Sequence, residues 1–312
     1  TQPPETMRVA VAGTGSFAKH FIDELPAAGH EIVVLTRSHK DFLDGKKGLV
    51  EQRVTDYSSV SQLVEVLKDC DALVSTISDM QHPDAEIHLT LLEACKQSPK
   101  CKRFIPSEYG VNPEDTDTCS MFQHNRRLKK TLKAQTEVEW TFIAIGCLMD
   151  YIVPSTNRNH PSIGPLFALD LEARTMTIPG TGNDVFSTTS ARDVAKVIAE
   201  LLKSTNKWRP YTYVQGMQTT WLQLAELVKT VGGVSDLKVS FEPIDEIKAA
   251  LEKKESPQAA LLAEFKMLVP SGRCTFDQEK VKRDRVEHFP NVHLRTAQEL
   301  LEEVKQDPTV TI

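Results

Sequence analysis

Short apolar runs alternate with stretches of helical periodicity along the first half of the chain. The apolar and β-branched runs predict strands at residues 7–12, 31–37, 49–54, 71–78, 103–107 and 140–145. Amphipathic patterns between them predict helices at residues 17–28, 58–68, 85–96 and 121–133. Strands that alternate with helices over short connections are typical of an α/β fold with a doubly wound, Rossmann-type parallel sheet.

The rhythm changes after about residue 151, where prolines interrupt a loop-rich stretch. Residues 175–187 predict two short strands around a Gly/Asn turn, and residues 190–204 predict a helix that returns to the main domain, with Ser190 as N-cap and Asp193 at N3. Further strands are expected at 211–214 and 238–241, and helices at 221–230, 244–254, 257–267 and 296–305. We expect a Rossmann domain over 7–152 and a smaller α+β substrate lobe over 153–312.

Composition narrows the class of protein. The 312 residues are 40% hydrophobic, which suffices for a large core. A net charge of -6 argues against a nucleic-acid partner, and neither a membrane-spanning run nor a signal peptide is visible. The six cysteines show no C-x-x-C and no Cys/His zinc spacing, so we expect reduced thiols, no metal and a cytoplasmic location. The oligomeric state stays open.

A glycine turn follows the first predicted strand directly. Gly13, Gly15 and Ala18 form Gly-x-Gly-x-x-Ala between that strand and a helix, which is the context of a dinucleotide fingerprint. The first glycine permits a tight turn and the second lets the backbone approach a pyrophosphate, while the alanine keeps the helix near its strand. The free N–H groups of the helix N-terminus would bind the anion.

The end of the second predicted strand indicates which dinucleotide binds. An NAD site usually carries an acidic residue there, for the ribose 2′-hydroxyl. This chain carries Arg37, Ser38, His39 and Lys40 instead, a cationic tip that suits a 2′-phosphate. We therefore predict NADP(H), with ordinary solvated loop charge as the alternative.

Ligands of doubly wound sheets bind outside the carboxyl ends of the strands. The residues at those ends are the predicted cofactor contacts, namely Gly13, Thr14, Gly15, Ser16, Phe17, Arg37, Ser38, Lys40, Asp56, Ser75, Thr76, Ile77, Ser107, Gly146, Cys147 and Leu148.

Three stretches carry a family resemblance: the glycine turn, residues 103–110 (Arg-Phe-Ile-Pro-Ser-Glu-Tyr-Gly) and residues 179–186 (Pro-Gly-Thr-Gly-Asn-Asp-Val-Phe). The chain resembles the NmrA-like and isoflavone reductase-like family of atypical short-chain dehydrogenases, and looks more like its fungal members of secondary metabolism. The resemblance covers residues 7–205 well. It implies a Rossmann domain, NADP(H) and a variable C-terminal substrate lobe.

The catalytic residues depart from related patterns. No tyrosine has a lysine four residues on, as ordinary short-chain dehydrogenases require. Reductases of the resembled family place a lysine three residues beyond a phenylalanine, and here the frame from Phe122 puts Asn125 at that position. The side-chain amide of asparagine can donate a hydrogen bond, but it cannot transfer a proton as a general acid near neutral pH. Predicted catalytic residues are Asn125, Tyr109 and Tyr151, with His124 and the basic residues Arg126, Arg127, Lys129 and Lys130 as weaker alternatives.

Three functions follow from these residues. The leading hypothesis is an NADP(H)-dependent oxidoreductase acting on a bulky natural product at a carbonyl, an imine or iminium, or an activated alkene. An iminium-like substrate would need no strong acid, which fits Asn125. The alternatives are a redox-neutral isomerisation or cyclisation assisted by the cofactor, and an NADP-sensing regulator without turnover, as in NmrA-type relatives.

Overall fold

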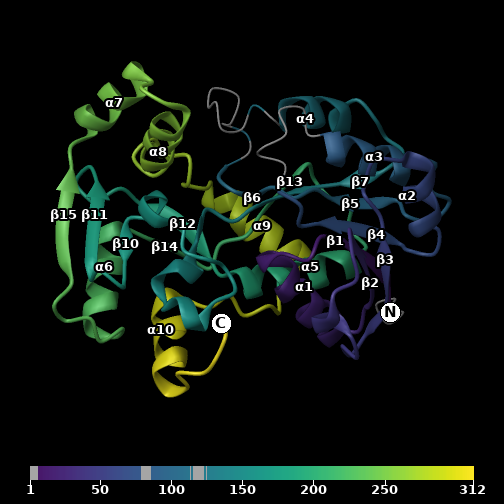
Figure 1. Cartoon of the computed structure of the whole chain (residues 1–312), viewed down its shortest axis with the longest axis horizontal. Coiled ribbons are helices and arrows are strands. Elements are labelled where there is room, and N and C mark those ends of the chain that lie inside the picture. The colour runs from purple at the N-terminus through teal and green to yellow at the C-terminus, as the bar shows by residue number, and fades with distance from the viewer. Residues whose placement is uncertain (1–5, 79–85, 113, 115–122, 124) are drawn as a thin grey trace.

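The computed structural model describes residues 6–78, 86–112, 114, 123 and 125–312. Within these ranges no helix is both long and apolar enough to cross a membrane. Figure 1 shows the N-terminal strands and helices gathered at one end of the molecule and the C-terminal lobe at the other.

The larger sheet has six strands, all parallel, in the order β3-β2-β1-β4-β5-β7. This order reverses between β1 and β4, which is the point where a doubly wound sheet leaves its ligand crevice. The predicted fold class is therefore confirmed. The strands are β1 (Arg8–Ala12), β2 (Glu31–Thr36), β3 (Leu49–Val54), β4 (Ala72–Ser75), β5 (Arg103–Ile105) and β7 (Glu139–Trp140).

Helices cover both faces of this sheet because its central strands are apolar on both sides. In β1, Val9 and Val11 pack into the cluster that holds α1 and α5, whereas Ala10 and Ala12 pack into the cluster that holds α2, α3 and α4. The helices are α1 (Ser16–Ala27), α2 (Val60–Val66), α3 (Glu86–Gln97), α4 (Arg126–Lys133) and α5 (Ala191–Lys203).

A small parallel sheet extends the main domain. It consists of β6 (Tyr109–Gly110), β8 (Phe142–Ala144) and β13 (Tyr211–Tyr213). The predicted strand at 140–145 is thus split at Thr141, whose hydroxyl lies 2.9 Å from that of Thr212. The interruption moves the chain from β5 to new neighbours.

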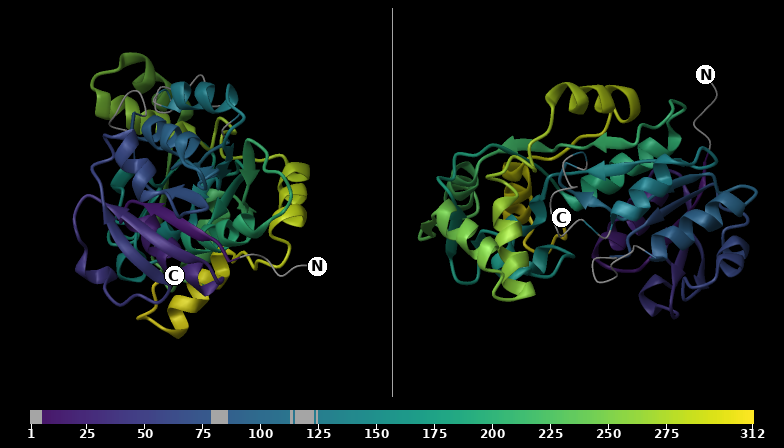
Figure 2. Two further views of the ribbon diagram at one scale, coloured as in Figure 1. Left: turned by 90° about the vertical axis from the view of Figure 1, so that its right-hand side faces the viewer. Right: turned by 90° about the horizontal axis from the view of Figure 1, so that it is seen from above.

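The C-terminal lobe has two further three-stranded sheets around a separate core. One contains β9 (Cys147–Leu148), β12 (Phe186–Thr189) and β14 (Met217–Thr219), and the other contains β10 (Leu169–Asp170), β11 (Thr175–Pro179) and β15 (Lys238–Glu242). Its helices are α6 (Trp221–Thr230), α7 (Ile244–Lys253), α8 (Pro257–Met267) and α10 (Ala297–Gln306), and short 3-10 turns lie at η4 (Met149–Ile152), η5 (Ser155–Asn157) and η6 (Gly164–Leu166). Figure 2 shows this lobe beside the sheet domain.

The two short strands predicted around a Gly/Asn turn within 175–187 do not form a hairpin. Both strands form, but β11 pairs with β10 and β15 while β12 pairs with β9 and β14. Gly180 and Gly182, both with positive φ, turn the chain from one sheet to the other. The predicted turn is therefore confirmed, whereas the expected pairing of the two strands across it is wrong.

Two segments of the second half pack on the first core. The predicted return of the 190–204 helix is seen as α5 packing on α1, where Arg192 Nη1 lies 2.6 Å from Glu24 Oε1. The sequence did not predict α9 (Gln278–His288), which docks on β13 through a 2.9 Å bond from Tyr213 N to Asp284 Oδ2. A division near residue 152 with these two returns remains our proposal for the domains.

Buried acidic residues of the lobe hold this packing together. Ser190 caps α5 as predicted, and the Asp193 carboxylate accepts bonds from the backbone and the guanidinium of Arg295 at 2.7 and 3.0 Å. Asp150 accepts from the N–H of Ala191 at 2.9 Å. The Asp193 carboxylate therefore pairs with a cation, whereas Asp150 uses only Oδ2 at the start of α5 and leaves Oδ1 without a partner among the described residues.

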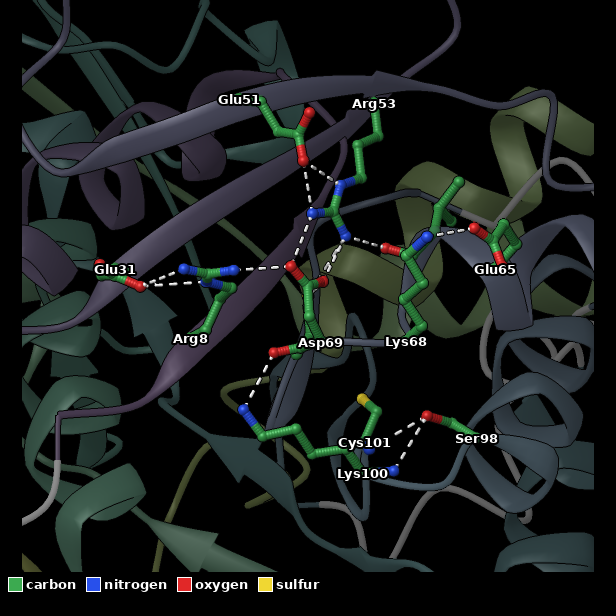
Figure 3. A network of polar contacts seen from close by, with 12 residues as sticks. Arg8, Glu31, Glu51, Arg53, Glu65, Lys68, Asp69, Ser98, Lys100 and Cys101 are labelled. Carbon is green, nitrogen blue, oxygen red and sulfur yellow. Dashed lines mark hydrogen bonds and ion pairs between the residues drawn. The ribbon is translucent and has the colours of Figure 1, made fainter.

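A charged network at the periphery of the main sheet joins β1, β3 and the segment after α2 (Figure 3). The Asp69 carboxylate lies 2.6 Å from Arg8 Nη1 and 2.6 Å from Arg53 Nη1. Its hydrogen bonds with Arg53 and Arg8 hold the pKa of Asp69 well below its ordinary value. The network links β1, β3 and the segment after α2 by ion pairs.

Candidate cofactor and active site

The glycine loop closes against the end of β4. Gly13 has φ +99°, and a Cβ added there would lie 2.6 Å from Thr76 Oγ1. That hydroxyl donates to the Ala12 carbonyl at 2.8 Å, so Thr76 is held in place and its side chain fills the space beside Gly13. Ile77 lines the same space. Only glycine fits this turn.

The helix that follows offers an uncapped N-terminus. Gly15 is the N-cap of α1, and within the described residues no side chain caps it and no acidic residue occupies the first turn. Orphan N–H groups at such a position, together with the helix dipole, favour an anion. Thr14, Ser16 and Phe17 are only partly buried beside it. The loop therefore has the geometry to hold a diphosphate.

The cationic tip lies just beyond β2. Arg37 and Ser38 are exposed, and Lys40 Nζ lies 3.1 Å from Ser38 Oγ. Asp56 stands past the end of β3, where hydrogen bonds from Ser58, and more weakly the charge of Arg37, lower its pKa. Cationic donors thus stand where an adenosine ribose would reach from the glycine loop.

Ser75 differs from its neighbours because its side chain serves the interior. It is fully buried, with Oγ 2.9 Å from His88 Nε2, and the same nitrogen accepts from the N–H of Ser107 at 3.3 Å. His88 therefore ties the ends of β4 and β5 together. No sequence pattern pointed to this histidine, which lies on the buried face of α3.

Tyr109 is held by two contacts. Its hydroxyl donates to the Ser75 carbonyl at 2.8 Å, and its ring stacks on Phe17 with centroids 4.7 Å apart. Burial raises the pKa of this phenol above its ordinary value. These contacts suit a residue that supports the glycine loop better than one that transfers a proton, and the catalytic role stays a prediction.

Asn125 meets an acidic partner that sequence reasoning missed. The asparagine is 5% exposed at the start of α4, and its Nδ2 donates to Glu108 Oε2 at 2.5 Å. Burial raises the pKa of Glu108 to about 7, against the opposing effects of the Lys129 charge and of the Asn125 bond. Glu108 lies inside the motif that carried the resemblance, which was the available signal. His124 and Phe122 lie outside the described residues.

The last predicted cofactor segment is a strained turn into β9. Gly146 has φ +72°, and an added Cβ would lie 2.0 Å from the Ser187 carbonyl oxygen. Cys147 and Leu148 follow, each partly exposed, and Cys147 Sγ lies 3.6 Å from Cys274 Sγ. Backbone from the lobe thus packs directly behind this predicted contact.

Tyr151 lies apart from the other two predicted catalytic residues. Its ring packs 5.2 Å from that of Phe167 and under the guanidinium of Arg158 at 5.3 Å. It lines a cleft of about 480 Å³ within the lobe, together with Leu169 and Leu301. The structure brings Asn125 near Glu108 and Tyr109, and places Tyr151 at a different cavity.

Fold and glycine loop together define a protein of the Rossmann-type doubly wound class. Residues 5–273 match the NmrA-like family, and the chain belongs to that family. The resemblance inferred from the three motifs is therefore confirmed.

Two curated relatives cover nearly the whole chain. Oxidoreductase swnR of Arthroderma benhamiae is 37% identical over 305 residues, covering 97% of this chain and 99% of the relative. Oxidoreductase swnR of Metarhizium robertsii is 34% identical over 307 residues, with the same coverage of 97% and 99%.

Solved structures share the fold. AtPrR2 with NADP+ and (+)pinoresinol superposes with a TM-score of 0.76 at 23% identity, covering 96% of this chain and 99% of that one. A ternary complex of leucoanthocyanidin reductase from Vitis vinifera gives a TM-score of 0.73 at 19% identity, covering 95% and 98%. At 23% and 19% identity, this similarity establishes the fold alone.

Proposed function

We propose that this protein is an NADP(H)-dependent oxidoreductase that acts on a bulky natural product. The observation that carries the proposal is the glycine loop at the sheet's switch point, with the Cβ space of Gly13 filled by Thr76 and the N-terminus of α1 left uncapped. Two relatives above 30% identity are oxidoreductases by name, and the similar AtPrR2 structure holds NADP+.

The choice of NADP(H) over NAD(H) rests on the tip of β2. Arg37 and Lys40 supply positive charge, and Ser38 supplies a hydroxyl, where an NAD enzyme would carry a carboxylate. A guanidinium binds phosphate by charge-assisted hydrogen bonds, which contribute more than neutral ones. The 2′-phosphate therefore has a binding group and the unphosphorylated ribose lacks its usual one.

Bound NADPH would supply a hydride to an electrophilic carbon of the substrate. The chain's own part is to bind the cofactor, to orient the substrate and to hold a proton. Because Glu108 Oε2 accepts from Asn125, a proton on this carboxyl resides on Oε1, and its pKa of about 7 keeps it partly protonated near neutral pH. We propose Glu108 as proton donor, with Asn125 as the residue that orients it.

Substrates of the imine or iminium class fit this arrangement. An iminium carbon accepts hydride without an acid, and an imine or ketone needs only one proton, which Glu108 would supply. In the frame read from Phe122, Asn125 stands where the resembled reductases carry a lysine. A cationic substrate is tolerated better beside an amide than beside an ammonium group.

The first experiment compares cofactor binding by titration calorimetry. We expect NADPH to bind at least tenfold more tightly than NADH, and Arg37→Ala to remove most of that difference, since a charge-assisted bond contributes about 1.5–3 kcal/mol. Arg174→Ala is the matched control, because Arg174 is an exposed arginine of the lobe paired with Asp236 at 2.7 Å. Binding of neither coenzyme, or equal binding of both, would overturn the proposal.

The second experiment measures turnover with cyclic imines as probes. NADPH consumed in proportion to reduced product supports the oxidoreductase. Product formed with only catalytic amounts of cofactor would replace it by the redox-neutral isomerisation or cyclisation. Tight NADPH binding without conversion of imines, ketones or activated alkenes would instead favour the NADP-sensing regulator.

A further inference from the structure

Three ionisable side chains meet in the interior between the glycine-loop helix and the lobe. His20 lies on α1, Asp150 lies in the η4 turn after β9, and His160 lies in the loop before η6. His20 and Asp150 are fully buried and His160 is 8% exposed. One ligand atom from each, a ring nitrogen or a carboxylate oxygen, lies within 4.8 Å of the other two.

Most polar atoms of this cluster lack a partner. Within the described part of the chain, His20 Nδ1, Asp150 Oδ1 and both ring nitrogens of His160 make no hydrogen bond. The separation of 3.9 Å between His160 Nδ1 and Asp150 Oδ1 is too long for one. Four buried unsatisfied atoms in a single place are costly, so a polar species is expected to complete them.

The hydrogen bonds that His20 and Asp150 make leave one polar atom of each side chain unpartnered among the described residues. Asp150 Oδ2 is used by the N–H of Ala191 at 2.9 Å, which leaves Oδ1 for the cluster. His20 Nε2 lies 3.3 Å from Asn159 Nδ2, which leaves Nδ1. The two imidazole rings are nearly parallel, at 12°, with centroids 5.9 Å apart.

The donor atoms suit a cation. A neutral imidazole nitrogen without a proton has a lone pair to donate, and a carboxylate oxygen adds negative charge. The cluster thus combines two neutral nitrogen donors with one carboxylate.

Two of the nearby cations have carboxylate partners. Arg295 binds Asp193 and Glu303, at 3.0 and 2.7 Å. Arg192 pairs with Glu24 at 2.6 Å. A third, the guanidinium of Arg158, donates to the backbone carbonyls of Val153 and His160, and Asp150 Oδ1 keeps no hydrogen-bond partner among the described residues.

We propose that His20, Asp150 and His160 bind one divalent transition-metal ion of the zinc class. Two imidazole nitrogens and a carboxylate oxygen form a three-residue donor set that zinc uses in proteins, with a fourth position left for water. The residues come from distant parts of the sequence, so the spacing rules that led us to expect no metal would not detect them.

The ion would tie the glycine-loop helix to the start of the lobe. His160 packs edge-on against Phe17 at 4.9 Å, and Phe17 stacks on Tyr109. An ion at this place fixes α1 against the 149–160 segment and so fixes the ring beneath the glycine loop. We assign the ion a role in packing, because all three ligands are buried.

The test starts from untagged protein stripped with EDTA and dialysed. We expect ZnCl₂ titration to give one ion per chain by elemental analysis, together with a rise in melting temperature. His160→Gln and His20→Gln should each weaken Zn²⁺ binding more than tenfold. The control is His39→Ala, which removes the exposed group of His39, Asp41 and Asp44 and should leave the binding unchanged.

Co²⁺ gives a readout that needs no variant. We expect ligand-field bands in the visible range without the intense near-ultraviolet absorption of thiolate ligands, which the Cys147 and Cys274 pair would give. No uptake of Zn²⁺ at micromolar concentrations, uptake abolished by His39→Ala, or a thiolate spectrum would each overturn the proposal. The first result would assign buried water to the cluster.

Discussion

Replacing Gly146 by alanine probes the contact between the end of β8 and the lobe. The added Cβ would lie 2.0 Å from the Ser187 carbonyl oxygen and 2.5 Å from its carbon. Both are backbone atoms, so the clash cannot be relieved by turning a side chain. Gly146 also has φ +72°, where a non-glycine residue is strained.

The magnitude follows from these two effects. The left-handed conformation costs alanine about 1–2 kcal/mol. Displacing packed backbone costs about 1–3 kcal/mol more, by analogy with overpacked cores. We therefore expect Gly146→Ala to lower the free energy of unfolding by about 2–5 kcal/mol, and to weaken NADPH binding because Cys147 and Leu148 follow the displaced residue.

Gly233→Ala separates the two effects. Gly233 has φ +76°, but an added Cβ would meet nothing within 4 Å, so this variant carries the conformational strain alone. The assay is urea unfolding followed by far-UV circular dichroism, with midpoint and slope compared among the two variants and the parent. Equal midpoints for Gly146→Ala and Gly233→Ala would refute the steric reasoning.

Two further predictions concern pH. Because burial raises the pKa of Glu108 from 4.5 to about 7, the folded chain keeps a proton there that the unfolded chain loses, and this contribution to stability falls as pH rises from 4.5 to 7. Glu108→Gln should flatten that part of the profile in urea unfolding, and an unchanged slope would contradict the pKa. Asp69 has the opposite sign, since bonds with Arg53 and Arg8 lower its pKa: its stabilisation is complete at pH 6 and fades as pH falls below about 4. Asp69→Asn should therefore unfold earlier than the parent at pH 6, by a margin that shrinks toward pH 3; a margin independent of pH would show that the ionised pair is not its origin.

Hydrophobic periodicity sufficed for the main sheet because its central strands β1, β2 and β4 are apolar runs, buried on both faces, between amphipathic helices. The glycine turn could also be predicted, since Gly13 and Gly15 meet local backbone requirements that few other residues satisfy. The pairing of strands in the lobe could not be predicted from the sequence. Short strands such as β11 and β12 can pair with several partners, and the choice depends on contacts made far along the chain.

Candidate site residues divide in the same way. Arg37 and Gly13 were located by their position after a strand, whereas the bond between Asn125 and Glu108 depends on how α4 settles over the end of β5. The role of His88 could not be predicted, because a histidine on an apolar helix face is usually interpreted as a core residue. Side chains that work through tertiary contacts leave little trace in local sequence patterns.

The chain crosses between its two hydrophobic cores more than once, and this affects how the molecule unfolds and how it can evolve. After leaving the sheet domain it returns through α5, and again through Phe289, Val292 and Leu294, before Ala297 and Leu300 re-enter the lobe. The lobe therefore cannot be exchanged as one continuous C-terminal fragment without also replacing parts of the first core. New specificities in such an architecture are expected to arise by substitution within the lobe, and loosening either half should be felt in the other as lost cooperativity.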